Sequence, residues 1–343
     1  MQRHATSSAS HPRSACLWRM VLTLALLCAA SLCPCRAAQA TTIQRAYVGV
    51  QQLVPIDAAR RLNLVCMGQG APTVVFESGL SDWSFTWALV QPTVARTTRT
   101  CAYDRAGLGA SDPTERSADS DHMVDDLHRL LSRAGIDGAL VLVGHSMGAL
   151  NVRLYADRYP AQVVGMVLVD PSHEDAFTRI DAHRNQQETR RYALQRAQAA
   201  ACVQDLTQHR VDSTWRARCI EPDDPHYDRR LNAARRAVAS RLSYQRAQLD
   251  EITHYADGSS FAQVRAARRP LGALPLIVLT AQQTLLQAGD DWLDLHRELA
   301  ALSSRGQQRT VAGAGHYIQL DRPDAVIEAI GEVIAVSRTA ATD

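Results

Sequence analysis

The sequence predicts an α/β fold, in which short buried strands alternate with amphipathic helices. Residues 139–143 and 163–169 are short apolar runs, as expected for parallel strands that are buried on both faces. The stretch after the first run has helical spacing, with Leu150 and Leu154 four positions apart, and it stops before Pro160. At 343 residues, 46% hydrophobic and 21% charged, the chain can bury a core in one large domain or two of ordinary size.

The first 40 residues predict an export signal. Arg3, Arg13 and Arg19 give a positive start, an apolar stretch spans 20–30, and an A-x-A cleavage site ends at Ala40. The apolar stretch is about half as long as a membrane span needs to be. We therefore expect a periplasmic or secreted protein with no integral membrane domain in the mature chain. An uncleaved segment that anchors the protein to the envelope is the alternative.

Export changes how the cysteines are interpreted. Four cysteines lie beyond the signal, and in an oxidising compartment they predict two disulfides with three possible connectivities. We favour Cys66–Cys101 and Cys202–Cys219, because each pair falls within one region of the chain. A zinc site is not predicted, since neither pair has ligand spacing and no histidine cluster accompanies them.

The N-terminal half shows the patterns of four strands and two helices. Strands are predicted at 46–50, 61–66, 73–76 and 99–103, the first two as a hairpin, and helices at 84–95 and 120–134. Either Ser120 or Asp121 is expected to cap the second helix. In the loop after 99–103, Asp104, Arg105 and Asp112 are typical of residues that fix a loop rather than of catalysts.

The most informative motif is Gly144-His145-Ser146-Met147-Gly148. A serine between two glycines at a strand-to-helix turn is the pattern of a nucleophile elbow. Strand and helix pass so close there that a Cβ at position 144 or 148 would clash. Ser146 is expected in a strained conformation, with its hydroxyl facing away from the sheet. A chance match in a glycine-rich turn is the alternative, and the flanking strand and helix argue against it.

After 163–169 the pattern changes and then returns to strands and helices. Residues 177–270 are rich in Arg, Gln and Ala and lack strand-like runs, which predicts an inserted helical segment. Its 17 Arg against 11 acidic residues over 178–270 are interpreted as solvated helix faces, with recognition of anionic substrates or a negatively charged surface as the alternative. Strands follow at 274–280 and 307–311, with a helix at 292–302, and Pro323 opens a last amphipathic helix.

Together these motifs resemble, in order and spacing, those of the α/β-hydrolase superfamily, in particular its serine esterase branch with a helical cap. The resemblance rests on segments 77–80, 103–112, 144–148 and 315–316.

This resemblance implies an eight-stranded, mostly parallel sheet flanked by helices. The hydrolase core would comprise 41–170 and 271–343, and the cap would comprise 171–270. In the strand order of the superfamily the second and fourth strands are neighbours, which makes a Cys66–Cys101 disulfide reasonable.

The resemblance also assigns the general base and offers a choice of acids. His316, in the glycine-bearing loop after the last strand, holds the position of the base. Most members place the acid directly after the seventh strand, but residues 281–284 contain no carboxylate. Asp170, at the end of 163–169, holds the alternative acid position and is our choice, with Asp290 or Asp291 as alternatives.

Several other residues near these motifs receive roles. The loop 77–80 follows a strand at the edge of the sheet where ligands bind, and Gly79 would let its backbone turn toward a ligand. Gly79 and His173 are therefore candidates for lining the substrate pocket, whereas His145 is interpreted as structural.

The predicted reaction is hydrolysis of a carboxylic ester through an acyl-enzyme. His316 takes the proton of Ser146 as the hydroxyl attacks the carbonyl carbon, and Asp170 holds the imidazole in the required tautomer. Backbone N–H groups of Leu80 and Met147 are expected to bind the oxyanion.

Other activities on the same residues stay open. A serine at position 146 argues against the dehalogenase and epoxide-hydrolase branches, which use Asp there. An amidase, peptidase or acyltransferase would share the triad, and a ligand-binding protein without activity would share the fold. The expected partner is a small-molecule ester. No cofactor or metal is predicted, the net charge of +2 gives no support for nucleic-acid binding, and the oligomeric state is not indicated.

Overall fold

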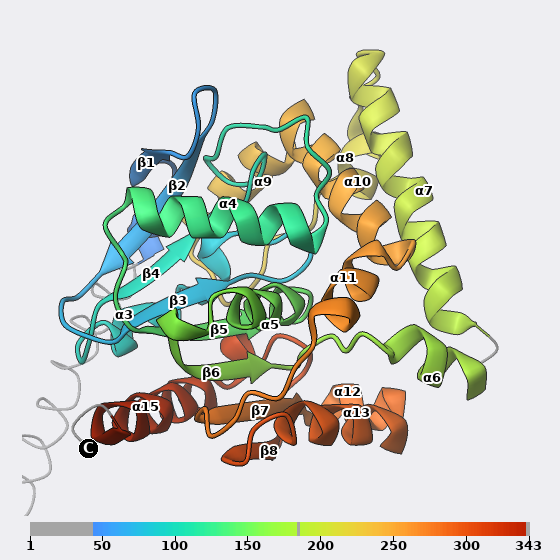
Figure 1. Ribbon diagram of the computed structural model, residues 1–343. Helices are drawn as coiled ribbons and strands as arrows, with labels where there is room; N and C mark the ends of the chain where they lie inside the picture. The colour runs from blue at the N-terminus through green and yellow to red at the C-terminus, as the bar shows by residue number, and fades with distance from the viewer. Residues whose placement is uncertain (1–43, 184–185, 341–343) are drawn as a thin grey trace, which may run out of the picture. The chain divides into compact units, whose positions relative to one another are not determined.

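The computed structural model describes residues 44–183 and 186–340, which form an eight-stranded, mostly parallel sheet flanked by helices (Figure 1). The strand order is β1-β2-β4-β3-β5-β6-β7-β8, and β2 runs antiparallel to both of its neighbours. The predicted α/β fold class and sheet are thereby confirmed. The strands are β1 (Gln52–Pro55), β2 (Arg61–Met67), β3 (Thr73–Glu77), β4 (Thr100–Tyr103), β5 (Leu140–His145), β6 (Val163–Val169), β7 (Leu276–Ala281) and β8 (Gly306–Val311).

Helices surround the sheet and fill the insertion between β6 and β7. Those outside the insertion are η1 (Arg45–Tyr47), η2 (Ser84–Trp87), α3 (Gln91–Val94), α4 (Ser120–Arg133), α5 (Gly148–Arg158), η3 (Pro160–Gln162), α12 (Gln282–Ala288), α13 (Asp290–Ala300), α14 (Ile318–Asp321) and α15 (Pro323–Ala340). Those inside it are α6 (Ala176–His183), α7 (Gln187–Thr207), α8 (Ser213–Cys219), α9 (Arg229–Ala239), α10 (Leu242–Ala256) and α11 (Ser259–Ala267).

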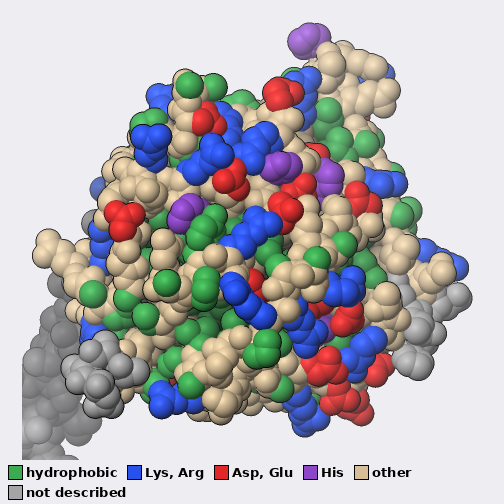
Figure 2. Space-filling model, in the orientation of Figure 1, with side chains coloured by type: hydrophobic (Ala, Val, Ile, Leu, Met, Phe, Trp, Pro, Cys, Tyr) green, Lys and Arg blue, Asp and Glu red, His purple; other side chains and the backbone are tan. Residues whose placement is uncertain are grey.

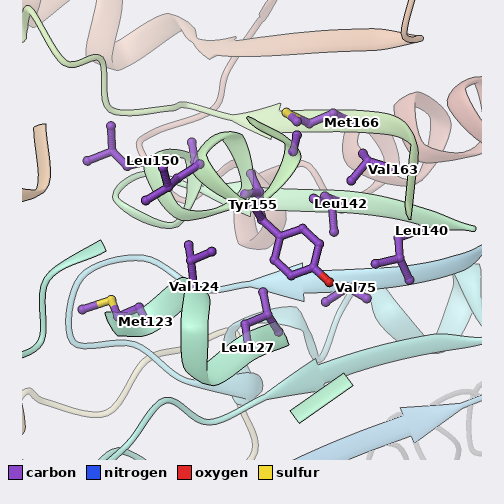
Figure 3. Packing of buried hydrophobic residues seen from close by; sticks show 14 of the residues in the cluster. Val75, Met123, Val124, Leu127, Leu140, Leu142, Leu150, Tyr155, Val163 and Met166 are labelled. Atoms are coloured by element: carbon purple, nitrogen blue, oxygen red, sulfur yellow. The ribbon is translucent and has the colours of Figure 1, made fainter. Parts of the chain in front are cut away.

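Alternate residues of the central strands pack against opposite helical layers. In β5, Leu140 and Leu142 face the core formed with α4 and α5, part of which is shown in Figure 3. Val141 and Val143 lie in the second core, which includes the apolar side of α15. All four side chains are fully buried. Burial on both faces explains why this strand is a continuous apolar run rather than an alternating one.

The predicted strand at 46–50 was wrong. Residues Arg45–Tyr47 form the short helix η1, and the first strand begins at Gln52. Between them, Gly49 has a φ of +82°, which ends any extended run through Val48 and Val50.

Two details of the predicted helices also differ from the structure. The expected helix at 84–95 is divided into η2 and α3, with Pro92 in the first turn of the second piece. The N-cap of α4 is Asp119 rather than Ser120 or Asp121, because the Asp119 carboxylate accepts a hydrogen bond from the backbone N–H of His122.

The insertion between β6 and β7 is helical, as predicted. Within its described residues, the long helix α7 runs beside α10 at the edge of the molecule (Figure 1). A disulfide joins Cys202 to Cys219, and a second one joins Cys66 to Cys101, which are register partners on β2 and β4. Both predicted pairings are confirmed. On the surface of the molecule, acidic and basic side chains are interspersed over the face shown in Figure 2.

Residues 44–183 and 186–340 contain neither a candidate membrane-spanning helix nor a candidate metal site. No helix in these ranges has the length and apolar character of a membrane span, and no group of three or more potential ligands could hold a metal ion. The predicted export signal, residues 1–40, lies outside the described residues.

Candidate active site

Ser146 lies in the tight turn between β5 and α5. Its φ of +52° is in the left-handed region, which side chains other than glycine adopt at a cost. A Cβ on Gly144 would lie 2.7 Å from the carbonyl oxygen of Gly148, and one on Gly148 would lie 2.5 Å from the carbonyl oxygen of Ser78. The expected clash at both glycines is confirmed. The close approach brings the loop after β3 against the turn that carries Ser146.

His316 reaches Ser146 from the loop after β8. Its Nε2 lies 2.9 Å from the Oγ of Ser146. Several contacts hold the loop. Next to His316, the N–H of Gly315 donates to the Asp321 carboxylate at 2.7 Å, and the ring of His145 donates from Nε2 to the carbonyl oxygen of His316 at 3.0 Å. Burial lowers the pKa of His145 to about 3, so this ring is neutral. The structure therefore gives His145 a supporting contact with the loop of His316.

Asp170 completes the chain of contacts from the end of β6. Its Oδ2 accepts from the Nδ1–H of His316 at 2.7 Å and from the Thr284 hydroxyl at 2.8 Å, and its Oδ1 accepts from the N–H of Ala281 at 2.9 Å. Burial alone would raise the pKa of Asp170, but the hydrogen bond and charge of His316 hold it below the ordinary value of 3.8. Asp170 also has a left-handed φ, of +40°. The carboxylate is thus buried, ionised and aimed at the imidazole.

The alternative acids lie elsewhere. Asp290 and Asp291 form the first turn of α13, where acidic residues complement the helix dipole. The Nδ1 of His316 is engaged by Asp170 instead. Thr284, which sequence reasoning missed, explains the difference: it lies in the first turn of α12, directly after β7, and donates to Asp170 from there.

Two backbone N–H groups belong to the segments that meet at the turn of Ser146, namely the start of α5 and the loop after β3. Met147 precedes the first residue of α5, and N–H groups at the start of a helix have no carbonyl partner within it. Leu80 is the second residue of a turn in which the N–H of Asp82 donates to the carbonyl of Gly79 at 3.2 Å, so the turn leaves the N–H of Leu80 unpaired. A helix N-terminus and an adjoining turn are suited to binding negative charge.

A cavity of about 310 Å³ opens onto Ser146 and His316. Part of its wall is aromatic or aliphatic, contributed by Ala176, Phe177, Ile180, Tyr192, Tyr255, Ala288 and Trp292. The other wall residues are polar, and among them Ser172 exchanges a hydrogen bond with the Tyr255 hydroxyl at 2.8 Å. Residues of the inserted helices and of the sheet edge therefore meet in one cavity at Ser146.

The two residues expected to line the pocket are not part of this wall. Gly79 packs against the ring of His145, since a Cβ on it would lie 2.8 Å from the Nδ1 of that ring. His173 is fully buried and accepts a hydrogen bond from the N–H of Asp175 at 3.0 Å. Burial lowers the pKa of His173 to about 4, as expected for a neutral packing residue.

The chain is similar to several known proteins. A sequence model of the α/β hydrolase fold family matches residues 72–323. YqjL of Bacillus subtilis (strain 168), named as uncharacterized, is 25% identical over 270 residues, which cover 78% of this chain and 85% of YqjL. RutD of Escherichia coli O17:K52:H18 (strain UMN026 / ExPEC), provisionally named a carbamate hydrolase, is 28% identical over 284 residues, which cover 80% of this chain and 91% of RutD.

Solved structures share the fold. A protein from Acinetobacter baumannii AYE, provisionally described as a lipase, superposes with a TM-score of 0.65 at 16% identity and covers 88% of this chain and 96% of that one. The epoxide hydrolase CorEH superposes with a TM-score of 0.59 at 18% identity, covering 82% and 97%. At such identities the likeness shows the fold alone.

Proposed function

Because the chain belongs to the α/β-hydrolase family, we propose that it is a serine hydrolase that cleaves carboxylic esters. Ser146 acts as nucleophile, His316 as general base and Asp170 as the acid of the triad. The observation that carries the proposal is the unbroken line of contacts from the Oγ of Ser146 to His316 at 2.9 Å and from His316 to Asp170 at 2.7 Å. Nucleophile, base and orienting carboxylate within hydrogen-bond reach are the signature of covalent catalysis.

The mechanism follows from these contacts. The Nε2 of His316 accepts the hydroxyl proton as the Oγ of Ser146 attacks the ester carbonyl carbon. Asp170 keeps the proton of the ring on Nδ1 and stabilises the imidazolium. The imidazolium then gives its proton to the departing alcohol. Water, deprotonated by the same ring, attacks the acyl carbon; the imidazolium then returns this proton to the Oγ of Ser146 as the acid is released.

The oxyanion is bound by the N–H groups of Leu80 and Met147. Both belong to backbone that is already fixed, so binding the charge costs little reorganisation. Such donors are typically worth about 10²–10³ in kcat each.

The cavity favours compact substrates with an apolar part. At about 310 Å³ it is at the small end of ligand pockets, and its aromatic wall suits a short aliphatic or a single-ring group. We also propose that residues 171–270 act as a cap, which the contribution of Phe177, Tyr192 and Tyr255 to the cavity supports.

Carbamates are the second candidate substrates, because RutD, provisionally named a carbamate hydrolase, covers most of this chain. A carbamate carbonyl would be attacked by the same serine. Export through residues 1–40 is also proposed, and the two disulfides support it because they persist in an oxidising compartment.

A substrate panel on the purified protein tests the assignment. It pairs p-nitrophenyl esters of short, aromatic and long acyl groups with a matched anilide, an aryl carbamate and styrene oxide. We expect the highest kcat/KM for the short and aromatic esters, with the long-chain ester a poor substrate. A higher kcat/KM for the carbamate would favour the second candidate, and turnover of the epoxide alone would refute the proposal.

A further inference from the structure

We propose that Glu251, on helix α10 of the inserted segment, is a positioning residue that holds the oxyanion loop, residues 78–82, in its binding geometry. The inference rests on the proposed function, since it assigns the N–H of Leu80 to the oxyanion. It adds that the inserted segment helps to build the catalytic centre as well as to shape the cavity.

Glu251 acts together with Arg105, which is buried beneath the loop. The guanidinium of Arg105 donates to both carboxylate oxygens of Glu251, at 2.7 and 3.0 Å, and to Glu77 at 2.9 Å. Both partner side chains are also buried, Glu77 completely. Burial alone would lower the pKa of Arg105, but the charges of Glu251 and Glu77 raise it above its ordinary value, so the guanidinium stays charged.

The same guanidinium holds the loop by its carbonyl groups. It donates to the carbonyl oxygens of Ser78 at 2.8 Å, Gly79 at 2.6 Å and Asp82 at 3.3 Å. Because a trans peptide unit is planar, its C=O and N–H point in opposite directions. The bond from Arg105 to the carbonyl of Gly79 therefore turns the N–H of Leu80, in the same peptide unit, away from Arg105.

The next peptide unit is held by Glu251 itself. Its Oε2 accepts from the backbone N–H of Ser81 at 2.7 Å. Ser81 has a left-handed φ of +65°, a conformation that needs support from its surroundings. Both peptide units that flank Leu80 are thus fixed, one by Arg105 and one by Glu251.

The network also reaches the second oxyanion donor. Glu77 accepts from the side-chain amide of Asn151 at 3.1 Å and from the hydroxyl of Tyr103. Asn151 lies on α5, the helix whose start carries the N–H of Met147. Removing the charge of Glu251 would leave Arg105 with one charged partner, Glu77. The position of the loop that carries Leu80 would then be less well fixed relative to the start of α5.

The test compares Glu251→Gln with a matched control, Glu174→Gln. Glu174 lies near the start of the inserted segment, and its fully buried carboxylate forms an ion pair with a buried arginine, Arg153, as Glu251 does with Arg105. Unlike Glu251, it does not contact the oxyanion loop. Rates are measured per active site, counted by titration with a fluorophosphonate, so that unfolded protein does not contribute.

We expect Glu251→Gln to lower kcat by about 10–100-fold with KM changed by less than about threefold, since small misplacements of catalytic groups cost up to about 10² in rate. Affinity for a trifluoromethyl ketone, whose adduct with Ser146 carries the oxyanion, should fall by the same factor as kcat/KM. Glu174→Gln should lose stability and keep kcat within about threefold.

Equal kcat for wild type and folded Glu251→Gln would overturn the inference, as would a ketone affinity that follows KM instead of kcat/KM. If Glu251→Gln does not fold, Glu251→Asp serves in its place, because the shorter side chain keeps the charge but moves the carboxylate away from the N–H of Ser81. An unchanged kcat in Glu251→Asp would also overturn the inference. These results are distinct from failure of the proposed function, in which the wild type itself would neither turn over esters nor be titrated at Ser146.

Discussion

Replacing Asp170 by Asn changes the proton pattern around His316 without changing the size of the side chain. The carboxylate accepts three hydrogen bonds, from Ala281, Thr284 and His316. If the Asn oxygen keeps the bond to the N–H of Ala281, its NH₂ group faces the Thr284 hydroxyl and the Nδ1 of His316. Nδ1 must then accept a hydrogen bond, so the ring proton moves to Nε2, which can no longer take the proton of Ser146.

The expected loss combines the wrong tautomer with the lost stabilisation of the imidazolium. We expect kcat to fall by about 10⁴, which corresponds to about 5 kcal/mol of transition-state stabilisation. Binding in the cavity is untouched, so KM should change little. The assay is p-nitrophenyl ester hydrolysis at neutral pH, with thermal unfolding recorded alongside to show that the variant is folded.

Asp290→Asn is the matched control, since it removes an exposed carboxylate at the start of α13. We expect kcat within about twofold of wild type for this variant, because surface substitutions away from a site have small effects. The assignment of the acid would be refuted if Asp170→Asn kept more than about a tenth of the activity. It would also be refuted if Asp290→Asn lost activity instead.

The remaining predictions concern stability, each followed by thermal unfolding. Burial alone would raise the pKa of Glu174, but the hydrogen bonds and the charge of Arg153 lower this pKa from 4.5 to about 2. The ionised carboxylate therefore contributes about 3 kcal/mol to the free energy of unfolding above pH 4.5, and this contribution is lost as the pH falls toward 2. In Glu174→Gln, the unfolding temperature should fall less steeply over the same acid range. Gly331→Ala lies in α15 with nothing within 4 Å of the new Cβ, so it should stabilise the protein by about 0.5–1 kcal/mol. Gly148→Ala should instead destabilise the protein and abolish activity, because its Cβ would lie 2.5 Å from the carbonyl oxygen of Ser78. Replacing Cys202 and Cys219 by Ala should cost about 3 kcal/mol with kcat unchanged, and equal unfolding temperatures with and without the disulfide would contradict this.

Features set by short stretches of sequence were predictable. The turn at Ser146 needs glycines on both sides for steric reasons that hold in any strand-to-helix crossing of this kind, and the clash distances at Gly144 and Gly148 bear this out. The strand at 46–50 was mispredicted because Val48 and Val50 have strand propensity, which the positive φ of Gly49 overrides.

Contacts between distant parts of the chain were not predictable from local patterns. Arg105 and Glu251 are 146 positions apart, so their ion pair leaves no spacing signal in the sequence. A weaker signal did exist: Glu251 shares the buried side of α10 with Ile252 and Tyr255, and a carboxylate among apolar positions indicates a buried cation partner. Thr284 could have been found by asking which group replaces the missing acid in the turn after β7.

The central claim is that Ser146 forms a covalent acyl-enzyme. The most direct measurement is intact-protein mass spectrometry after acid quenching during turnover of a p-nitrophenyl ester, with the adduct located by peptide mapping. We predict a mass increase equal to the acyl group, located on the Gly144–Gly148 peptide and absent from Ser146→Ala. An adduct on another residue, or ester turnover by Ser146→Ala at the wild-type rate, would contradict the account.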